Sequence, residues 1–128
     1  MEVTKRGQVR LHRVDLVFDT GFKLVNPLAV RKQIEGQIAW GYSDALYQEI
    51  TIRDGRAVER NFDTFQVSRM HEYPREVNIA FMKTDKWIEG AGEEAIPTVI
   101  PAIYNAVFKI TGKRIRSVPL KNHDLSWS

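Results

Sequence analysis

Residues 90–112 read Gly-Ala-Gly-Glu-Glu-Ala-Ile-Pro-Thr-Val-Ile-Pro-Ala-Ile-Tyr-Asn-Ala-Val-Phe-Lys-Ile-Thr-Gly, a glycine-rich loop that leads directly into an apolar repeat. The repeat has spacings of four and three, which predict the buried face of an amphipathic helix. Its members are Ile96, Ile100, Ile103, Val107 and Ile110. Gly112 is expected to end this helix. Its start is open between Pro97 and Pro101, because a proline inside a helix removes one backbone hydrogen bond.

Upstream of this stretch the sequence predicts strands and a hairpin. Apolar and polar residues alternate over residues 8–18 and 77–82, as in half-buried strands. The first of these changes parity midway, which indicates a bulge or a strand with two covered faces. Asp54-Gly55 is a type I′ turn signal, so we expect residues 46–53 and 56–62 to form a β-hairpin.

A second helix is predicted to start at Asn26-Pro27, with asparagine as the cap and proline in the first helical position. Four of its apolar residues fall near one face: Val30, Ile34, Ile38 and Ala45. Gly36 and Gly41 interrupt this helix, and a glycine there costs about 1 kcal/mol relative to alanine. Such glycines mark the close approach of either a ligand or a packed strand. Strands and helices mix without strict alternation, which predicts a two-layer α+β domain with a mixed β-sheet and two main helices.

The composition indicates one domain covering residues 1–128, with 43% hydrophobic residues and no internal repeat. The absence of cysteine excludes disulfides, cysteine-ligated zinc and iron–sulfur clusters held by this chain. No apolar run approaches the roughly 18 residues of a membrane span, so we expect no direct membrane insertion. Residues 1–20 lack a signal-peptide core, and as written the chain is expected in the cytoplasm.

Charge and the usual catalytic motifs are less informative. The net charge is +3, with basic residues gathered at both ends, a pattern typical of either a solvated surface or a phosphate-binding end. The three histidines are far apart in sequence, so we expect no metal to be held by this chain alone. No serine lies in a Gly-x-Ser-x-Gly setting, which gives no support to a serine hydrolase.

The loop at residues 90–95 formally matches the dinucleotide-binding pattern Gly-x-Gly-x-x-Ala. We reject that interpretation because Glu93 and Glu94 would face a pyrophosphate and no acidic residue follows at the required distance. Two interpretations remain from the residues alone. Glu93 is either a plain turn residue, or a general base beside glycines that admit a bulky group.

A collinear set of motifs adds to this pattern. Gly90-x-Gly92-Glu93 precedes Ile96-Pro97, the segment from Pro101 to Val107, the run from Thr111 to Arg116 and Pro119-Leu120. Upstream stand Asp19-x-Gly21, Asn26-Pro27, Gln33-Ile34-Glu35-Gly36, Ala45-Leu46-Tyr47, Asp54-Gly55, Asn61-Phe62 and Arg69-Met70. Together they closely resemble the C-terminal molybdopterin-binding segment of the xanthine dehydrogenase and aldehyde oxidase superfamily, the molybdenum hydroxylases. The similarity is greatest to the isoquinoline 1-oxidoreductase beta subunit and bacterial membrane-linked aldehyde dehydrogenases.

The resemblance implies an oxidoreductase that hydroxylates an aldehyde or an N-heteroaromatic ring with a molybdopterin cofactor, expected in its cytosine dinucleotide form. The catalytic glutamate of the family falls on Glu93, as the general base. The cofactor-contacting glutamine falls on Gln33, and the backbone of Gly90, Ala91 and Gly92 is expected to approach the cofactor. Two positions depart from the family pattern. Glu94 stands where many family members have proline, and it places a second carboxylate beside the base. Gln37 stands where family members often have glycine, and it is expected to narrow the access of the cofactor to the helix.

The family also implies partners. The remaining N-terminal part of the large subunit and an iron–sulfur small subunit are expected to complete the enzyme, and no nucleic acid is expected. The chain alone should therefore bind no cofactor tightly and be inactive, and a periplasmic or membrane-associated location stays open for the complete enzyme. The alternative is a free-standing, non-catalytic remnant that acts as a protein-interaction module.

Overall fold

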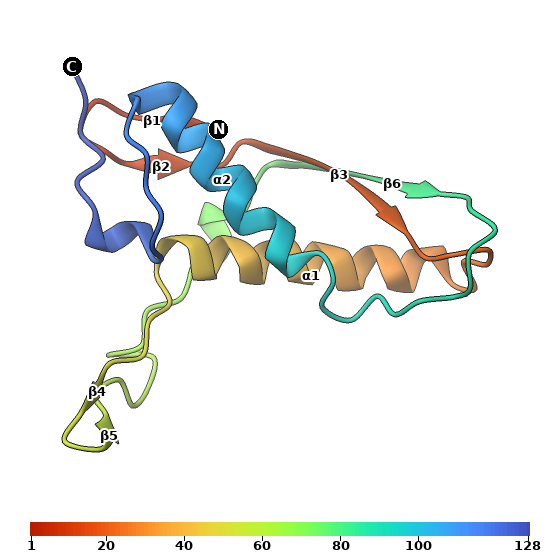
Figure 1. Cartoon of the computed structure of the whole chain (residues 1–128), viewed down its shortest axis with the longest axis horizontal. Coiled ribbons are helices and arrows are strands. Elements are labelled where there is room, and N and C mark those ends of the chain that lie inside the picture. Colours follow the sequence, from red (N-terminus) through yellow and green to blue (C-terminus); the bar gives the residue numbers. More distant parts are fainter.

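The computed structural model describes residues 1–128 and contains two long helices packed with short strands (Figure 1). The elements in chain order are β1 (Glu2–Val3), β2 (Val9–Arg10), β3 (Arg13–Asp19), α1 (Pro27–Leu46), β4 (Ile52–Arg53), β5 (Arg56–Ala57), the 3-10 turn η1 (Met70–Glu72), β6 (Glu76–Met82), α2 (Ile96–Thr111) and the 3-10 turn η2 (Leu120–Asn122). The α+β fold class predicted from the sequence is confirmed, and both main helices are present. Parallel and antiparallel pairing both occur, spread over three separate two-stranded ladders.

The element that organises the fold is a β-α-β unit. Strands β3 and β6 pair in parallel, in register from Arg13 opposite Glu76 to Asp19 opposite Met82. Helix α1 connects this pair along the sequence and runs beneath it in Figure 1. Burial alternates along both strands, so one face of the ladder is covered while the other stays exposed. Residues 83–95 then return from the end of β6 along α1 to the start of α2.

Helix α1 begins where the sequence predicts. The Asn26 side chain caps it by accepting a hydrogen bond of 3.0 Å from the Ala29 amide, and Pro27 occupies the first helical position. The predicted apolar face is buried, since Ile34, Ile38 and Ala45 are fully covered. These residues pack towards the ladder and α2.

Helix α2 runs from Ile96 to Thr111, so it starts at the earlier of the two positions considered and includes Pro101. Both Pro97 and Pro101 lie on the exposed face, where water can replace the missing hydrogen bond. Gly112 ends the helix as predicted, with a φ of 73° and its amide bonded to the Phe108 carbonyl.

The two glycines of α1 have different surroundings. A Cβ on Gly41 would lie 2.8 Å from the Val99 Cβ and 3.0 Å from the Ile96 carbonyl oxygen. Gly41 therefore allows α2 to cross α1 closely, so the approaching element is a helix instead of the expected strand or ligand. Gly36 is exposed, and a Cβ there would meet nothing within 4 Å.

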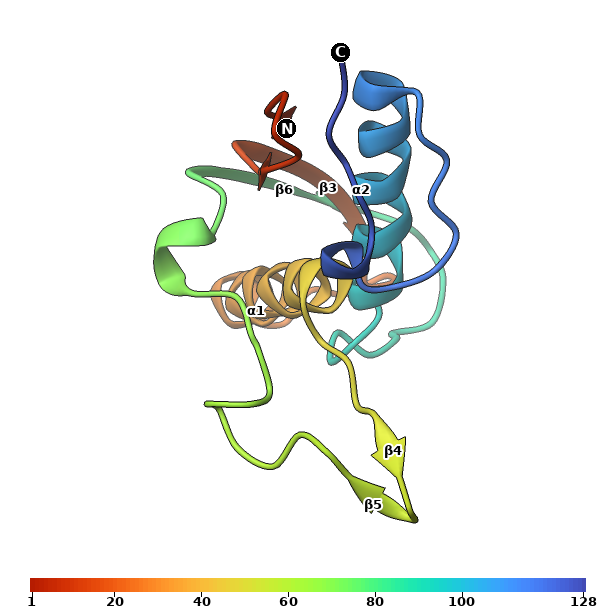
Figure 2. The ribbon, with the colours of Figure 1, turned by 90° about the vertical axis from the view of Figure 1, so that its left-hand side faces the viewer.

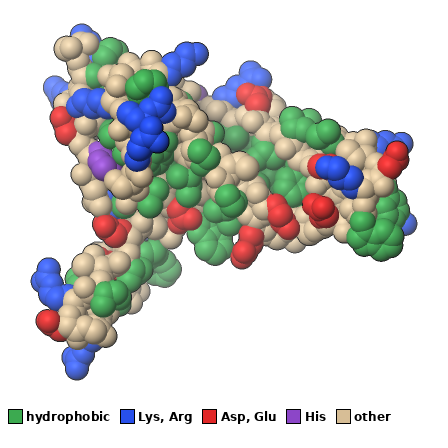
Figure 3. Space-filling model, viewed as in Figure 1, with side chains coloured by type: hydrophobic (Ala, Val, Ile, Leu, Met, Phe, Trp, Pro, Cys, Tyr) green, Lys and Arg blue, Asp and Glu red, His purple; other side chains and the backbone are tan.

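Two sequence predictions about strands need correction. The hairpin at Asp54-Gly55 exists, with both residues at positive φ as a type I′ turn requires, but its strands are only two residues long. Leu46 belongs to α1, and the rest of the arm stands away from the body of the molecule (Figures 2 and 3), where no second layer supports longer strands. The strand predicted at residues 8–18 is divided into β2 and β3, and the break between Arg10 and Arg13 explains the change of parity.

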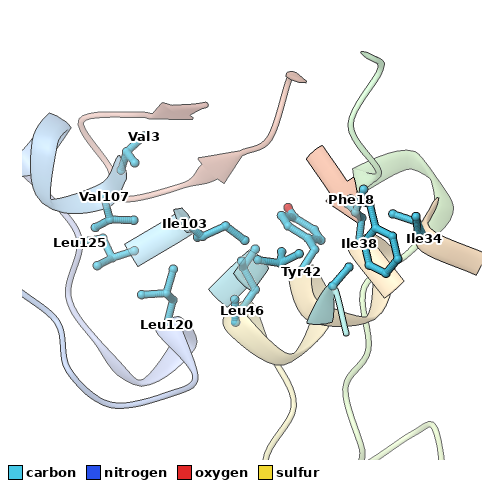
Figure 4. Close-up of a cluster of buried hydrophobic side chains, with 13 residues drawn as sticks. Val3, Phe18, Ile34, Ile38, Tyr42, Leu46, Ile103, Val107, Leu120 and Leu125 are labelled. Carbon is cyan, nitrogen blue, oxygen red and sulfur yellow. The ribbon is translucent and has the colours of Figure 1, made fainter. Parts of the chain in front are cut away.

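The hydrophobic core connects the termini to the two helices (Figure 4). Val3, Leu120 and Leu125 pack with Ile103 and Val107 of α2 at one end of the cluster. At the other end Phe18 of β3 lies over the buried residues of α1. Neither helix is long and apolar enough to serve as a membrane span.

Candidate functional site

The glycine-rich loop at residues 90–95 is held against the middle of α1 by a single side chain, Gln37. Its Nε2 donates a hydrogen bond of 2.5 Å to the Ala91 carbonyl, and its Oε1 accepts one of 2.7 Å from the Ala95 amide. Gln37 is only 4% exposed and lies on the buried face of the helix, with Ile34 and Ile38. One amide group thus closes both ends of the loop onto α1, which fixes its backbone path.

The two neighbouring glutamates are in different states. The Glu94 side chain folds back over its own loop, where Oε2 accepts a hydrogen bond of 2.9 Å from the Glu93 amide. Its Oε1 occupies the space beside Gly90, since a Cβ there would lie 2.6 Å from that oxygen. The Glu93 side chain is exposed and makes neither a hydrogen bond nor an ion pair within the chain. Glu93 is therefore the carboxylate that is free to act on another molecule.

Gln33 lies one helical turn before Gln37 on α1, with Gly36 beside it. The Gln33 side chain is exposed and has no hydrogen-bond partner within the chain. Gly36 and Gly92 both leave open space where a side chain would stand. The exposed surface of α1 therefore offers an unpaired amide and uncovered backbone, and the loop adds the uncovered backbone of Gly92, groups that can hold a polar, planar ligand.

The structure brings some of the predicted site residues together and leaves others apart. Ala91 contacts α1 directly through Gln37, and Gly90 and Gly92 flank it. Gln33 lies on the same helix but makes no hydrogen bond to the loop. A catalytic base beside a metal centre is expected to be buried, but Glu93 is exposed in this chain. No cluster of three His, Asp or Glu side chains forms in the chain.

Sequence reasoning missed the role of Gln37, which it treated only as an obstacle to the cofactor. The available signal was its position: Gln37 follows Gln33 by four residues and lies between the buried Ile34 and Ile38. A polar residue within a buried stripe needs hydrogen-bond partners, and those partners are 54 and 58 residues away.

The segment between β6 and this loop, residues 83–89, is anchored at Gly21. Its φ is +85°, and a Cβ there would lie only 2.2 Å from the Trp87 carbonyl oxygen, so no other residue fits. Asp19 accepts hydrogen bonds from the Gly21 amide at 2.9 Å and from the Thr84 hydroxyl at 2.8 Å. The bond from Gly21 is the main reason that the pKa of Asp19 lies below its usual range. The Asp19-x-Gly21 motif thus fixes the path of residues 84–87, just after the end of β6.

Several known proteins are similar to this chain in sequence. A family model described as a molybdopterin cofactor-binding domain matches residues 2–74, which include Gln33 and Gln37. A membrane-bound aldehyde dehydrogenase (pyrroloquinoline-quinone) of Gluconacetobacter polyoxogenes is 33% identical over 93% of this chain and 15% of that protein. The isoquinoline 1-oxidoreductase subunit beta of Brevundimonas diminuta is 32% identical over 85% of this chain and 14% of its own length. The chain therefore spans only about one seventh of these curated relatives.

Solved structures share its fold. The crystal structure of quinoline 2-oxidoreductase from Pseudomonas putida 86 matches with a TM-score of 0.78 and 25% identity, over 90% of this chain and 16% of that chain. The copper- and molybdenum-containing CO dehydrogenase matches with a TM-score of 0.60 over 72% of this chain and 12% of that chain. At 22% identity, the second likeness concerns the fold alone.

Proposed function

Because the chain belongs to the molybdopterin cofactor-binding domain family of the molybdenum hydroxylases, we propose that it forms one side of the cofactor site in a larger oxidoreductase. The substrate class is an aldehyde or an N-heteroaromatic compound, as the names of the relatives suggest. The observation that carries the proposal is the double hydrogen bond of Gln37, which holds the loop at residues 90–95 against α1, the helix that also carries Gln33. The bound cofactor supplies the redox chemistry of the reaction.

The residues present fit a molybdopterin group. Gly36 lies inside a helix, where it costs about 1 kcal/mol relative to alanine, and no contact within the chain explains it. A planar ligand stacked against α1 at this point would require a residue without a side chain. Gln33 supplies a donor and an acceptor for a pterin edge, and Gly90, Ala91 and Gly92 supply backbone groups. The cytosine dinucleotide form of the cofactor is part of this proposal.

Glu93 acts as the general base in this proposal. Its carboxylate has no partner within the chain and can accept a proton from the oxygen nucleophile during hydroxylation. Glu94 has a positioning role, because its carboxylate is already bonded to the Glu93 amide and lies against Gly90. The exposed position of Glu93 supports a site completed by other polypeptide, with the N-terminal part of the large subunit and an iron–sulfur subunit as the proposed partners.

Paired substitutions in a complete large subunit that carries this segment test these roles. Glu93→Gln is expected to lower kcat by 100-fold or more while the molybdenum content stays near that of the parent. Glu94→Gln keeps most of the activity, because an amide oxygen can still accept the bond from the Glu93 amide. Full activity of Glu93→Gln, or a larger loss of activity for Glu94→Gln than for Glu93→Gln, would show that Glu93 is not the general base.

The 128-residue chain alone is proposed to be inactive, because one side of a site cannot enclose a cofactor. Purified chain incubated with an aldehyde and an electron-accepting dye should reduce no dye above background. Immobilised chain should instead retain a molybdenum-containing partner from an extract of its host. Substrate-dependent dye reduction by the purified chain would contradict the proposal.

A second candidate function is a non-catalytic protein-interaction module. The observation in its favour is an exposed aromatic pair, Phe22 and Trp87, whose ring centres are 5.7 Å apart. Val25 and Leu28 are exposed nearby in sequence, at 77% and 67%. Exposed apolar clusters of this kind mark interfaces. The same extract experiment separates the two functions, because a retained partner that contains no molybdenum favours the module.

A further inference from the structure

A cavity of about 710 Å³ lies away from the loop at residues 90–95, and no residue of the candidate cofactor site lines it. It is open to solvent on one side and is lined by four segments: residues 7–12 around β2, the last turn of α1, residues 71–75 and residues 120–125. Its volume is within the range of small-molecule sites. Leu11, Leu46, Leu120 and Leu125 give part of its lining an apolar character.

The side chains around this cavity carry an excess of positive charge. Arg10, Arg75 and Lys121 line it, and the only acidic residue among the lining residues is Glu72. Both oxygens of Glu72 are already used, by the Tyr47 hydroxyl and by the Arg69 amide at 2.6 Å. Arg10 and Arg75 form no ion pair, and the contact of Lys121 with Glu49 is a long one of 3.8 Å. A concave surface with unpaired cations attracts anions.

Tyr42 provides a hydrogen-bond donor inside this cavity. The residue is only 2% exposed, yet its hydroxyl makes no hydrogen bond within the chain, and Figure 4 shows it directed away from the α1 ribbon. Burial, with a smaller effect of the nearby Glu72 charge, raises the pKa of Tyr42 to about 12, so the hydroxyl keeps its proton at neutral pH. The hydroxyl oxygen is accessible from the cavity, because Thr20 Oγ1 is the only fully buried side-chain oxygen or nitrogen without a partner, so a ligand or water in the cavity can accept the bond of Tyr42.

From these features we infer that the cavity binds an aromatic carboxylate, with the Tyr42 hydroxyl and the Arg75 guanidinium directed to the carboxylate and the leucines and tyrosine rings around the aromatic body. The volume exceeds what an inorganic anion fills, and the apolar lining favours a ligand with a hydrophobic part. Tyr47 and Tyr73 offer ring surfaces for stacking. This inference does not depend on the proposed role of the chain in molybdopterin binding.

Calorimetric titration of the chain with benzoate tests the site, with benzyl alcohol and inorganic phosphate as matched probes. Benzoate should bind saturably and at least tenfold more tightly than either, because only benzoate combines a ring with a negative charge. Amide chemical-shift changes should concentrate at residues 7–12 and 71–75. The inference is overturned by absent benzoate binding, by phosphate binding as tightly as benzoate, or by shifts centred on residues 90–95.

Variants locate the contacts. Tyr42→Phe keeps the buried ring and removes an unpaired hydroxyl, so the fold is retained while benzoate affinity falls about tenfold or more. Arg75→Gln should weaken binding and reduce its dependence on salt. Arg53→Gln, in the arm outside the cavity, is the matched control and should leave affinity unchanged. If Tyr42→Phe and Arg75→Gln both bind benzoate as the parent does, the inference is wrong.

Discussion

Replacing Gln37 by alanine is the most direct test of how the loop at residues 90–95 is held. Gln37 is the only hydrogen-bond partner of the Ala95 amide, and Ala95 is 2% exposed, so the variant leaves a buried N–H unsatisfied at a cost of about 1–3 kcal/mol. The Ala91 carbonyl is half-buried and can bond to water instead, which adds about 0.5–1 kcal/mol. The expected loss in the free energy of unfolding is therefore about 1.5–4 kcal/mol.

Urea unfolding measures this loss, and native-state hydrogen exchange measures where it arises. The Ala95 amide should be protected in the parent and exchange much faster in Gln37→Ala, while the amides in the centre of α2 change only with global stability. Gln33→Ala is the matched control, since Gln33 is an exposed glutamine one turn away without a partner, and it should cost less than 0.5 kcal/mol. Equal costs for the two variants, or unchanged exchange at Ala95, would refute the reasoning.

Gly21, the tyrosines and Asp124 offer further tests of the backbone contacts and the pKa values. Gly21→Ala should lower the free energy of unfolding in urea by more than about 3 kcal/mol, because its Cβ would lie 2.2 Å from a backbone oxygen. Gly55→Ala has a similar φ but its Cβ would lie in open space, so it should cost about 1 kcal/mol. Similar costs for the two variants would contradict this explanation. Burial raises the pKa of all four tyrosines, so absorbance at 295 nm should show less phenolate in the folded chain than in the urea-unfolded chain at pH 10, and stability should fall as pH rises from 10 towards 12; equal phenolate in the two states would be inconsistent with this burial. Hydrogen bonds from Ser126, with Lys113 nearby, lower the pKa of Asp124 from 3.8 to about 2. The stability that the ionised carboxylate contributes above pH 3.8 is therefore lost as pH falls towards 2. Asp124→Asn should flatten the plot of unfolding free energy against pH in this range, and an unchanged slope would exclude the effect.

The parts of the fold that the sequence predicted correctly depend on interactions between near neighbours. The Asn26 cap bonds to an amide three residues away, the Gly112 turn bonds to a carbonyl four residues back, and the Asp54-Gly55 turn involves adjacent dihedral angles. Each can be recognised in a short window because the physical cause lies within that window. The lengths of the hairpin strands depend on whether a second layer covers them, and residue types in the arm do not encode that.

The candidate site was only partly predictable for the same reason. The glycines and glutamates at residues 90–94 stand out in the sequence, but the element that positions them is a glutamine more than 50 residues earlier. Resemblance to a family directed attention to Gln33, whose side chain is free, whereas hydrogen bonding within the chain selects Gln37. The resemblance also assigned the base to Glu93, and the structure adds the physical difference between the two glutamates, because only the Glu94 side chain folds back onto its own loop.

The two glycines of α1 differ in what the packing of the chain requires of them. Gly36 and Gly41 give the same signal in the sequence, a helix-interior residue that lowers helix stability by about 1 kcal/mol. At Gly41 the packing of α2 explains the residue, because a side chain would collide with Val99. At Gly36 nothing in the chain does so, and this unexplained cost falls on the surface beside Gln33 where the cofactor is proposed to lie. A glycine that the chain's own packing does not require therefore indicates contact with another molecule more strongly than a glycine motif does, because the contacts within the chain have already removed internal packing as the explanation.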